Sequence, residues 1–447
     1  MTADPGPRPS PPRVPRPTGL VLSPFRALRF DSAVAGDLAT LTCPPYDVLD
    51  AEAVAALEVL SEDNVVRLIL PRDGVVAGQD RYAGAAATLV AWRDAGVLVP
   101  DPVPALYVYE QAAPGGHVQR GLLGALGLSP AEDGIVLPHE NTMAGPVSDR
   151  LALYTATGAD LEPIFLVYDG GGAASRAVAS AGAPPSAAGD GAVLLVDSVL
   201  TDGLRHRLWA VTDPQTVGEI AADLLSRKAL IADGHHRYAT YLRRQALRHE
   251  AGDGPGPWDL GLCLLVDATT FGPQVHPIHR VIPGVGVDEL AQRAAAGLTV
   301  RRLDSSLEEA LAALAVAGRG GPAFLLASGD GHVLQLLTDP DPVRLAAAVP
   351  PGRSLLWAQL DVSVLHAYVV AHLWGLPDDV EHVGYEHDVA GALAAAARSD
   401  GTAVLLNPTP VEAVAAVAGA GERMPRKSTL FTPKPRTGLV LRDHRDA

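Results

Sequence analysis

The sequence predicts an α+β fold in which mixed sheets are flanked by helices. Strand and helix signals follow one another irregularly, without the strict strand–helix–strand order of a doubly wound sheet. No segment recurs at a fixed period, which argues against a repeat architecture. Hydrophobic residues make up 48% of the 447 positions and charged residues 19%, so the chain can bury a large core. This length predicts several domains rather than one.

The N-terminal part combines a proline-rich tail with a first α+β region. Residues 1–19 are predicted to be disordered, because they are rich in proline and poor in large apolar side chains. Residues 20–128 are expected to form the first folded region. Its predicted elements are an extended segment at Pro24–Phe30, a stiff turn at Cys43–Asp47, a short buried strand at Val65–Leu70, a helix at Tyr82–Ala95 and hairpin strands at Ala105–Glu110 and Gly121–Leu128.

A second region is expected over residues 129–285, and a third, α/β in character, over 286–447. The second region has predicted strands at Pro163–Tyr168, Ala229–Ala232 and Gly261–Asp267, a helix that ends near Thr157 and a helix at His235–Glu250. Ser148 is the expected cap of the first of these helices. Residues 170–192 are rich in Gly, Ala, Ser and Pro and predict a loop or linker.

Charge and cysteine content narrow the class of function. The net charge is −16, which argues against a general nucleic-acid binder, since such proteins meet phosphates with basic surfaces. The two cysteines, Cys43 and Cys263, cannot build a disulfide framework, so a reducing, cytoplasmic location is expected. The sequence shows no signal peptide and no uninterrupted run of about 18 apolar residues, so no membrane partner is expected. A small-molecule partner is expected, and the sequence leaves a homo-oligomer open.

The strongest local motif runs from Ile231 to Tyr238, at the junction of a predicted strand and helix. The first backbone N–H groups of a helix lack intrahelical partners, and the helix dipole adds positive charge there. Gly234 allows close approach of the backbone, and Arg237 offers a planar fork that matches phosphate. The motif therefore predicts an anion site. The plainer alternative is a capped helix with a structural Asp233 and surface histidines.

A second motif, at residues 137–142, lies on a polar loop. Glu140 is a candidate general base, which His139 or Asn141 would orient. A solvated loop carboxylate is the alternative interpretation. Arg150 follows at the start of the next predicted helix, where an ordinary ion pair with its neighbour is the plainest interpretation.

A third motif, at residues 424–429, follows a predicted helix end. Lys427 and the hydroxyls of Ser428 and Thr429 are suited to hold a phosphate or a carboxylate. The segment is not a Walker A loop, because the glycine frame is missing. A basic loop without a ligand is the alternative. Arg67 is a weaker candidate, for which a surface ion pair is an equally plain interpretation.

Taken together, the motifs resemble a known family. The matching segments are Pro24–Arg29, Pro44–Val48, Asn64–Leu68, Leu137–Glu140, Ala232–Tyr238 and Met424–Thr429. They resemble the signature of domain-of-unknown-function family 1015 and spread over residues 22–441. That family is in turn similar to free L-serine kinases, which carry a ParB/sulfiredoxin-like fold. The second similarity rests on Pro-His-Glu, Asp-Gly-His-His-Arg and Pro-Lys-Thr-Thr segments in the same order, the last matched loosely because Arg426 is inserted here.

The resemblance implies a kinase that phosphorylates the hydroxyl of free L-serine and yields O-phosphoserine. It implies that Glu140 takes the hydroxyl proton, and that residues 233–237 hold the donor phosphates and a Mg²⁺ ion with Asp233 as ligand. The donor is left open among pyrophosphate, ATP and ADP. The implied roles are catalysis for Glu140, Asp233 and His236, phosphate binding for Gly234, His235, Arg237 and Lys427, and substrate binding for Arg67, His139, Asn141, Arg150, Ser428 and Thr429. The ParB/sulfiredoxin-like core is implied for residues 129–285, and the Lys427–Thr429 loop comes from the third region.

Two other activities on the same fold compete with the kinase. A ParB-like protein would be a nucleotide-binding regulator without kinase activity, and such proteins carry Gly-Glu-Arg-Arg where this chain has Gly234–Arg237. No basic recognition helix for DNA is evident in the sequence. A sulfiredoxin-like redox activity needs a thiolate in the phosphate loop, where this chain has His235. The kinase interpretation is therefore preferred.

Overall fold

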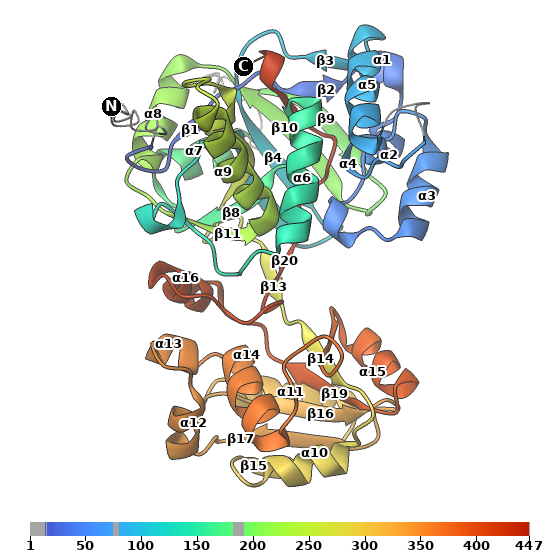
Figure 1. Ribbon diagram of the computed structural model, residues 1–447, viewed down its shortest axis with the longest axis vertical. Coiled ribbons are helices and arrows are strands. Elements are labelled where there is room, and N and C mark those ends of the chain that lie inside the picture. The colour runs from blue at the N-terminus through green and yellow to red at the C-terminus, as the bar shows by residue number, and fades with distance from the viewer. Residues whose placement is uncertain (1–13, 15, 75–79, 182–191, 447) are drawn as a thin grey trace, which may run out of the picture. The chain divides into compact units, whose positions relative to one another are not determined.

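The computed structural model describes residue 14 and residues 16–74, 80–181 and 192–446 (Figure 1). Residues 1–13 and 15 of the predicted proline-rich tail lie outside the described residues. The chain divides into two compact units. Unit 1 is formed by Met1–Leu137, Thr142–Pro273 and Pro433–Ala447, and unit 2 by Pro138–Asn141 and Gln274–Thr432. The predicted boundaries after residues 128 and 285 stay predictions.

Unit 1 is built around a nine-stranded mixed sheet. Its strands are β1 (Leu22–Ser23), β4 (Leu106–Ala112), β5 (Val118–Gly127), β6 (Val136–Leu137), β8 (Ile164–Tyr168), β9 (Ala192–Val199), β10 (Arg205–Val211), β11 (Ala229–Asp233) and β12 (Leu260–Asp267). The order is β6-β11-β8-β12-β5-β4-β10-β9, with β1 paired to β5. The β6–β11 and β8–β12 pairs are parallel, and the other pairs are antiparallel. Two short antiparallel pairs join β2 (Leu28–Phe30) to β3 (Leu98–Pro100) and β7 (Ala159–Asp160) to β21 (Arg442–Asp443).

Helices flank this sheet. They are α1 (Ser32–Ala35), α2 (Leu38–Leu41), α3 (Ala51–Leu60), α4 (Val66–Ile69), α5 (Arg81–Asp94), α6 (Ala144–Thr157), α7 (Gly172–Ala181), α8 (Pro214–Leu224) and α9 (His235–Glu250). Short 3₁₀ turns lie at Tyr46–Val48, Ala131–Asp133, Pro257–Asp259 and His444–Asp446. Helix α6 packs between α5 and α9, and α9 also contacts strands β8 and β12, while α7 packs on α8 (Figure 1).

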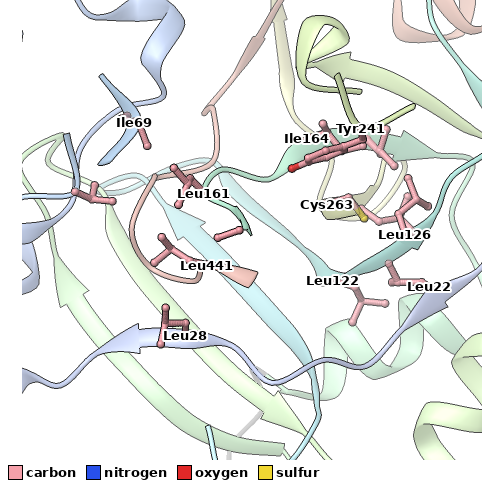
Figure 2. Close-up of a cluster of buried hydrophobic side chains, with 14 of the residues drawn as sticks. Leu22, Leu28, Ile69, Leu122, Leu126, Leu161, Ile164, Tyr241, Cys263 and Leu441 are labelled. Atoms are coloured by element: carbon pink, nitrogen blue, oxygen red, sulfur yellow. The ribbon is translucent and has the colours of Figure 1, made fainter. Parts of the chain in front are cut away.

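The apolar core of unit 1 lies among these helices and the sheet. Figure 2 shows part of it, where Leu126, Ile164 and Tyr241 gather side by side. Each large apolar side chain buried in this way contributes about 1.5–3 kcal/mol to folding. At Gly124 a Cβ atom would stand 2.6 Å from the Leu22 side chain, so glycine is needed where β1 pairs with β5. This core fixes the strands, and therefore the edge at which β11 ends.

Unit 2 contains a six-stranded antiparallel sheet with the order β15-β17-β16-β19-β14-β18. Its strands are β14 (His279–Ile282), β15 (Thr299–Arg302), β16 (Phe324–Ser328), β17 (Leu334–Thr338), β18 (Gly384–Glu386) and β19 (Thr402–Leu406). Its helices are α10 (Val287–Ala294), α11 (Leu307–Ala317), α12 (Pro342–Ala348), α13 (Leu355–Ala358), α14 (Asp361–Val364), α15 (Val389–Arg398) and α16 (Val411–Gly419), with a π-helical segment at Leu365–Trp374. A separate pair joins β13 (Gln274–His276) to β20 (Leu430–Thr432).

The predicted α+β class, with a large mixed sheet and flanking helices, is confirmed. The prediction of a short strand at Val65–Leu70 is wrong, because these residues contain helix α4. The side chain of Asn64 starts that helix, since its Oδ1 accepts the Val66 N–H at 2.9 Å. A short apolar run cannot by itself distinguish a buried strand from a buried helical turn.

Two further local predictions are wrong. Part of the loop expected at residues 170–192 forms helix α7, whose start is held by an Asp223 carboxylate that accepts the Ala174 N–H at 2.9 Å. Residues 182–191 of that loop lie outside the described residues. Helix α6 begins at Ala144, one turn before the expected cap Ser148.

Candidate functional site

The Asp233–Arg237 motif lies at the junction where β11 ends and α9 begins, as the sequence predicts. Gly234 connects them with φ at +91°, a left-handed conformation that favours glycine. A Cβ atom on Gly234 would stand 3.0 Å from Nε of Arg237. Gly234, the residue that precedes the first turn of α9, has no side chain with which to cap the helix. The first N–H groups and the positive end of the helix dipole therefore suit an anionic ligand.

Two carboxylates and two cations gather at this junction in unit 1. Asp233 accepts a hydrogen bond from Nη2 of Arg237 through Oδ2, and its Oδ1 lies 2.8 Å from Nζ of Lys434. Nζ of Lys434 also donates to Oδ2 of Asp47. We call these four residues the α9 cluster. Its formal charges, two negative and two positive, balance.

The ion pairs of the α9 cluster keep Asp47 and Lys434 charged at neutral pH. Burial alone would raise the pKa of Asp47, but Lys434 and Arg237 hold it below the ordinary value. Burial alone would lower the pKa of Lys434, but Asp233 and Asp47 raise it above the ordinary value. An ammonium and a carboxylate therefore face each other across a short contact.

Arg237 supports Asp233 from the interior of the unit. It is 1% exposed, and Nη1 donates to the Pro163 carbonyl at 2.6 Å. Burial alone would lower its pKa, but Asp233 and Glu162 raise it, so the guanidinium stays charged. Its Nε has no hydrogen-bond partner among the described residues. In this arrangement Arg237 orients the Asp233 carboxylate, and a direct contact with phosphate stays a prediction.

A buried carboxylate and an aromatic ring lie next to this arginine. Glu162 is completely buried, and its Oε1 accepts the Tyr46 N–H at 3.0 Å. Burial raises the pKa of Glu162. The guanidinium groups of Arg150 and Arg237 face the Tyr46 ring, at 4.5 and 5.9 Å from its centroid. Arg150 also donates to the Ile69 carbonyl at 2.6 Å, so it joins this buried network.

The two histidines of the motif have different surroundings. Nε2 of His236 accepts the Met143 N–H at 3.1 Å, which assigns the ring proton to Nδ1. Burial lowers the pKa of His236, so the ring is neutral at pH 7. His235 is buried at the first position of α9. Nε2 of His236 is thus occupied by a main-chain group, and a catalytic role for this ring stays a prediction.

The carboxylates of the α9 cluster fit a magnesium ion in number and chemistry. Mg²⁺ is usually held by one or two protein carboxylates together with substrate phosphates, and Asp233 and Asp47 supply two. No group of three or more His, Cys, Asp or Glu side chains within residues 16–74, 80–181 and 192–446 is placed to hold a metal. Phosphate oxygens and water would therefore complete the coordination. Asp47 would then join Asp233, the ligand that the family resemblance implies.

A second cluster forms in unit 2, where the Pro-His-Glu segment meets the loop after α16. Oε1 of Glu140 accepts the backbone N–H of Lys427 at 2.9 Å. The His139 carbonyl accepts the Met424 N–H at 2.8 Å, and His139 Nε2 lies 3.1 Å from Oγ1 of Thr429. The structure therefore brings two predicted motifs together and orients the Glu140 carboxylate through a main-chain donor.

Cationic and aromatic groups complete this second cluster. Lys427 has φ at +52°, which is uncommon for a residue other than glycine. Its Nζ stands 5.6 Å from the centroid of the Tyr385 ring, and the guanidinium of Arg280 faces the same ring at 4.8 Å. Burial lowers the pKa of Arg280 to about 10. The Ser428 hydroxyl donates to the Pro425 carbonyl and so shapes the loop.

The predicted site residues thus fall into two sets. Unit 1 contains Arg67, Arg150, Asp233, Gly234, His235, His236 and Arg237, and unit 2 contains His139, Glu140, Asn141, Lys427, Ser428 and Thr429. Asn141 is exposed, and nothing in its contacts shows the orienting role expected for it. Arg67 lies on α4, where its Nη2 donates to the Glu58 carbonyl at 2.9 Å. A substrate contact by Asn141 or Arg67 stays a prediction.

Asp47, Glu162 and Lys434 were not assigned to the site from the sequence. A signal for Lys434 exists, because the chain has only three lysines among 35 Lys and Arg residues. Two of the three, Lys427 and Lys434, lie in the same segment. Lysine differs from arginine in carrying a compact ammonium on a flexible stem, so its use in this segment singles out the two positions. Glu162 offers no comparable signal, because its burial depends on tertiary packing.

The cysteines give no support to the sulfiredoxin-like alternative. Cys43 and Cys263 are free and buried in unit 1. Burial raises the pKa of both thiols, so neither is a ready source of thiolate. In the described part of the chain, no helix has the length and apolar character needed to cross a membrane.

Comparison with known proteins identifies one matching family and several distant structures. Residues 22–363 match the family described as "Protein of unknown function (DUF1015)". No curated protein matches the chain. One similar solved structure is a free serine kinase in complex with AMP, with 15% identity and a TM-score of 0.34 over 75% of this chain and 92% of that chain. A conserved hypothetical protein from Pyrococcus furiosus has 14% identity and a TM-score of 0.34 over 75% of this chain and 100% of that chain. C-terminally truncated SbnI from Staphylococcus aureus has 11% identity and a TM-score of 0.33 over 72% of this chain and 87% of that chain. With TM-scores this low, the structural likenesses assign no activity.

Proposed function

This chain belongs to the DUF1015 family of proteins of unknown function, and we propose that it is a small-molecule kinase. In the proposed reaction a phosphoryl group passes from pyrophosphate, ATP or ADP to the hydroxyl of free L-serine, and the product is O-phosphoserine. The serine oxygen forms a bond to phosphorus while the anhydride P–O bond breaks. The hydroxyl proton passes to a carboxylate of the protein.

The α9 cluster is the observation that carries this proposal. Phosphoryl transfer needs positioning and charge neutralisation more than covalent chemistry from the protein. The start of α9 offers backbone N–H groups and the positive end of the helix dipole. Lys434 and the carboxylates of Asp47 and Asp233 stand beside it. This combination suits a polyphosphate that binds together with a divalent cation.

Each group of the α9 cluster is assigned a separate task. The first N–H groups of α9 and the ammonium of Lys434 bind phosphate oxygens of the donor. Asp233, oriented by Arg237, and Asp47 are the residues that would hold Mg²⁺. When bound, this ion supplies neutralisation of the charge that develops on the phosphate oxygens.

The acceptor proton is assigned to Glu140. A general base must be held in a defined orientation, and the Lys427 N–H at 2.9 Å from Oε1 provides one such constraint. The neighbouring side chains of His139, Ser428 and Thr429 are assigned to serine binding. Lys427 contributes positive charge to this cluster beside Arg280 and is assigned to an anionic group of a substrate.

The choice of serine as acceptor rests on the motifs. The segments Pro138–Glu140, Asp233–Arg237 and Pro425–Thr429 resemble, in order and type, those of free L-serine kinases. Two of these segments, separated by most of the chain, meet in unit 2. This meeting supports a shared task for them.

A donor–acceptor screen tests the proposal. The purified protein is mixed with L-serine, Mg²⁺ and one donor at a time, and phosphoserine is quantified by mass spectrometry. L-alanine, which lacks the hydroxyl, is the matched control for donor hydrolysis. We expect phosphoserine with at least one of pyrophosphate, ATP and ADP. Its absence with all three donors overturns the proposal, and calorimetric binding of ADP or ATP without turnover favours the regulator instead.

A further inference from the structure

The ammonium of Lys434 lies against two carboxylates that come from distant parts of the sequence. Its Nζ is 2.8 Å from Oδ1 of Asp233 and donates to Oδ2 of Asp47, a residue 387 positions away. Two carboxylates that converge on one cation form the kind of protein ligand set that Mg²⁺ uses. In this structure the cation that they hold is the lysine ammonium.

The backbone at Lys434 is firmly held, whereas its side chain keeps some freedom. Pro433 and Pro435 flank it and restrict the local dihedral angles. The Lys434 carbonyl accepts Nε2 of Gln111 at 2.9 Å, and the Pro433 carbonyl accepts Nε2 of Gln119 at 3.0 Å. The Lys434 side chain is 15% exposed. A flexible stem on a fixed anchor allows the ammonium to move without a change of fold.

Charge balance limits what this position can accept. The second oxygen of Asp233 already binds Arg237, a nearly fully buried guanidinium that cannot leave. While Lys434 is in place, the two carboxylates are therefore neutralised. A divalent cation therefore gains little electrostatic binding energy between these carboxylates, unless it brings anionic phosphates with it or the ammonium moves away.

We infer that Lys434 is a built-in substitute for the metal ion. The lysine ammonium lies between Asp47 and Asp233 until a divalent cation, accompanied by donor phosphates, displaces it. The inference rests on the proposed function, because it takes a metal-bound polyphosphate as the ligand of the α9 cluster. The displaced ammonium then becomes available to phosphate oxygens, which couples metal entry to donor binding.

Binding of Mn²⁺ alone tests this exchange. The free ion is measured by electron paramagnetic resonance during titration of the protein, without serine or any donor. The test variants are Lys434→Gln and Lys434→Met, and the matched control is Lys228→Met, which removes the remaining lysine outside the two clusters. Removal of one positive charge at contact distance is expected to tighten Mn²⁺ binding by about tenfold or more in both test variants. The control is expected to bind Mn²⁺ as weakly as the wild type.

A double variant identifies the ligands. Asp47→Asn in the Lys434→Gln background is expected to return Mn²⁺ affinity to the wild-type level. Circular dichroism checks the fold of each variant. If Lys434→Met does not fold, Lys434→Gln alone decides the test, because the glutamine amide still donates a hydrogen bond to a carboxylate. Equal Mn²⁺ affinity of the wild type and Lys434→Gln overturns the inference.

The two proposals fail in different ways. If Mn²⁺ binding tightens but no donor yields phosphoserine, the ligand exchange stands and the serine kinase activity is contradicted. If phosphoserine forms but Mn²⁺ binding is unchanged by Lys434→Gln, the kinase stands and the exchange is contradicted.

Discussion

Glu140 and Lys427 are 287 positions apart, yet within unit 2 a carboxylate oxygen of Glu140 accepts the backbone N–H of Lys427 at 2.9 Å. The segment Pro138–Asn141 belongs to unit 2, although the chain on both sides of it belongs to unit 1. Because the donor is a main-chain group, this contact does not require the lysine side chain. The Glu140 carboxylate and the Lys427 ammonium can therefore be tested by separate substitutions.

The first prediction concerns Glu140 itself. Glu140→Gln keeps an oxygen that can accept the Lys427 N–H but can no longer take a proton. We expect kcat for phosphoserine formation to fall by about 10²-fold or more, with an unchanged melting temperature. Glu381→Gln, which alters an exposed glutamate of the same unit, is the matched control. A wild-type kcat in Glu140→Gln would remove Glu140 from the mechanism.

The second prediction concerns the support of Asp233. Arg237→Ala removes the guanidinium that orients the Asp233 carboxylate. We expect the KM of the phosphoryl donor to rise by about tenfold or more, with a smaller effect on the KM of serine. Steady-state kinetics with each substrate varied in turn measures this split. Arg243→Ala changes an exposed arginine on the same helix and serves as the control.

Because Arg237 is buried, a general loss of fold must be separated from a loss of donor binding. Thermal unfolding of Arg237→Ala provides this check, and Arg237→Lys is the second variant because it retains the charge. A normal donor KM in a folded Arg237→Ala protein contradicts the assigned role.

The third prediction concerns a buried ion cluster in unit 1. Asp160 is fully buried and accepts hydrogen bonds from Nη2 of Arg244 at 2.7 Å and Nη1 of Arg442 at 2.8 Å. Asp160→Asn leaves two buried guanidinium groups without their counter-charge. We expect a loss of about 3–5 kcal/mol in the free energy of unfolding. Urea denaturation measures it, and Asp94→Asn, at an exposed site in the same unit, is the control.

The same carboxylate makes this loss dependent on pH. Burial alone would raise the pKa of Asp160, but Arg244 and its neighbours hold it well below the ordinary value of 3.8. Its stabilising contribution is therefore fully present above about pH 4 and is lost as the pH falls through the folded-state pKa. The difference between wild type and Asp160→Asn is expected to shrink in acid, and a constant difference down to pH 2 would contradict this account.

The fourth prediction concerns Asp361 in unit 2. Burial raises its pKa to about 7, against the opposing effect of Nδ2 of Asn407, which lies 3.4 Å from Oδ2. The raised folded-state pKa means that unit 2 loses stability as the pH rises from 4 to 7, because the carboxyl ionises in the unfolded chain while burial keeps it protonated in the folded one. Asp361→Asn avoids this cost. At pH 8 we expect it to be more stable than the wild type by on the order of 2–4 kcal/mol.

Thermal unfolding at several pH values tests the Asp361 prediction. The advantage of Asp361→Asn should disappear near pH 4, where the carboxyl is protonated in both states. Asp304→Asn, whose side chain is 95% exposed, is expected to show no such dependence. A variant that is less stable than the wild type at pH 8 would contradict the raised pKa.

The fold was predictable where local signals agree with tertiary packing. Helix α9 begins and ends at the expected residues, because a glycine turn precedes it and its pattern is helical throughout. The prediction failed at Val65–Leu70, where the side chain of Asn64 decides between strand and helix. Nδ2 of that asparagine also donates to the Thr40 carbonyl at 2.7 Å, a contact across the fold that periodicity does not reveal.

The candidate site was predictable in its motifs but not in its pairings. The Asp233–Arg237 junction follows from local sequence, since a strand, a glycine and a helix start are all visible there. The contact of Lys434 with Asp47 spans 387 positions and depends on how β4 and β5 hold the segment around Lys434. Such pairings arise from sheet topology, which the sequence pattern alone does not determine.

The transfer of label from serine tests the central claim most directly. The protein is supplied with L-serine that carries ¹⁸O in its hydroxyl, with Mg²⁺ and with pyrophosphate, ATP or ADP, and the product is weighed by mass spectrometry. Attack of the serine oxygen on phosphorus predicts phosphoserine that retains the ¹⁸O atom, and Glu140→Gln should form it at least about 10²-fold more slowly. No labelled phosphoserine with any of these donors would contradict the account.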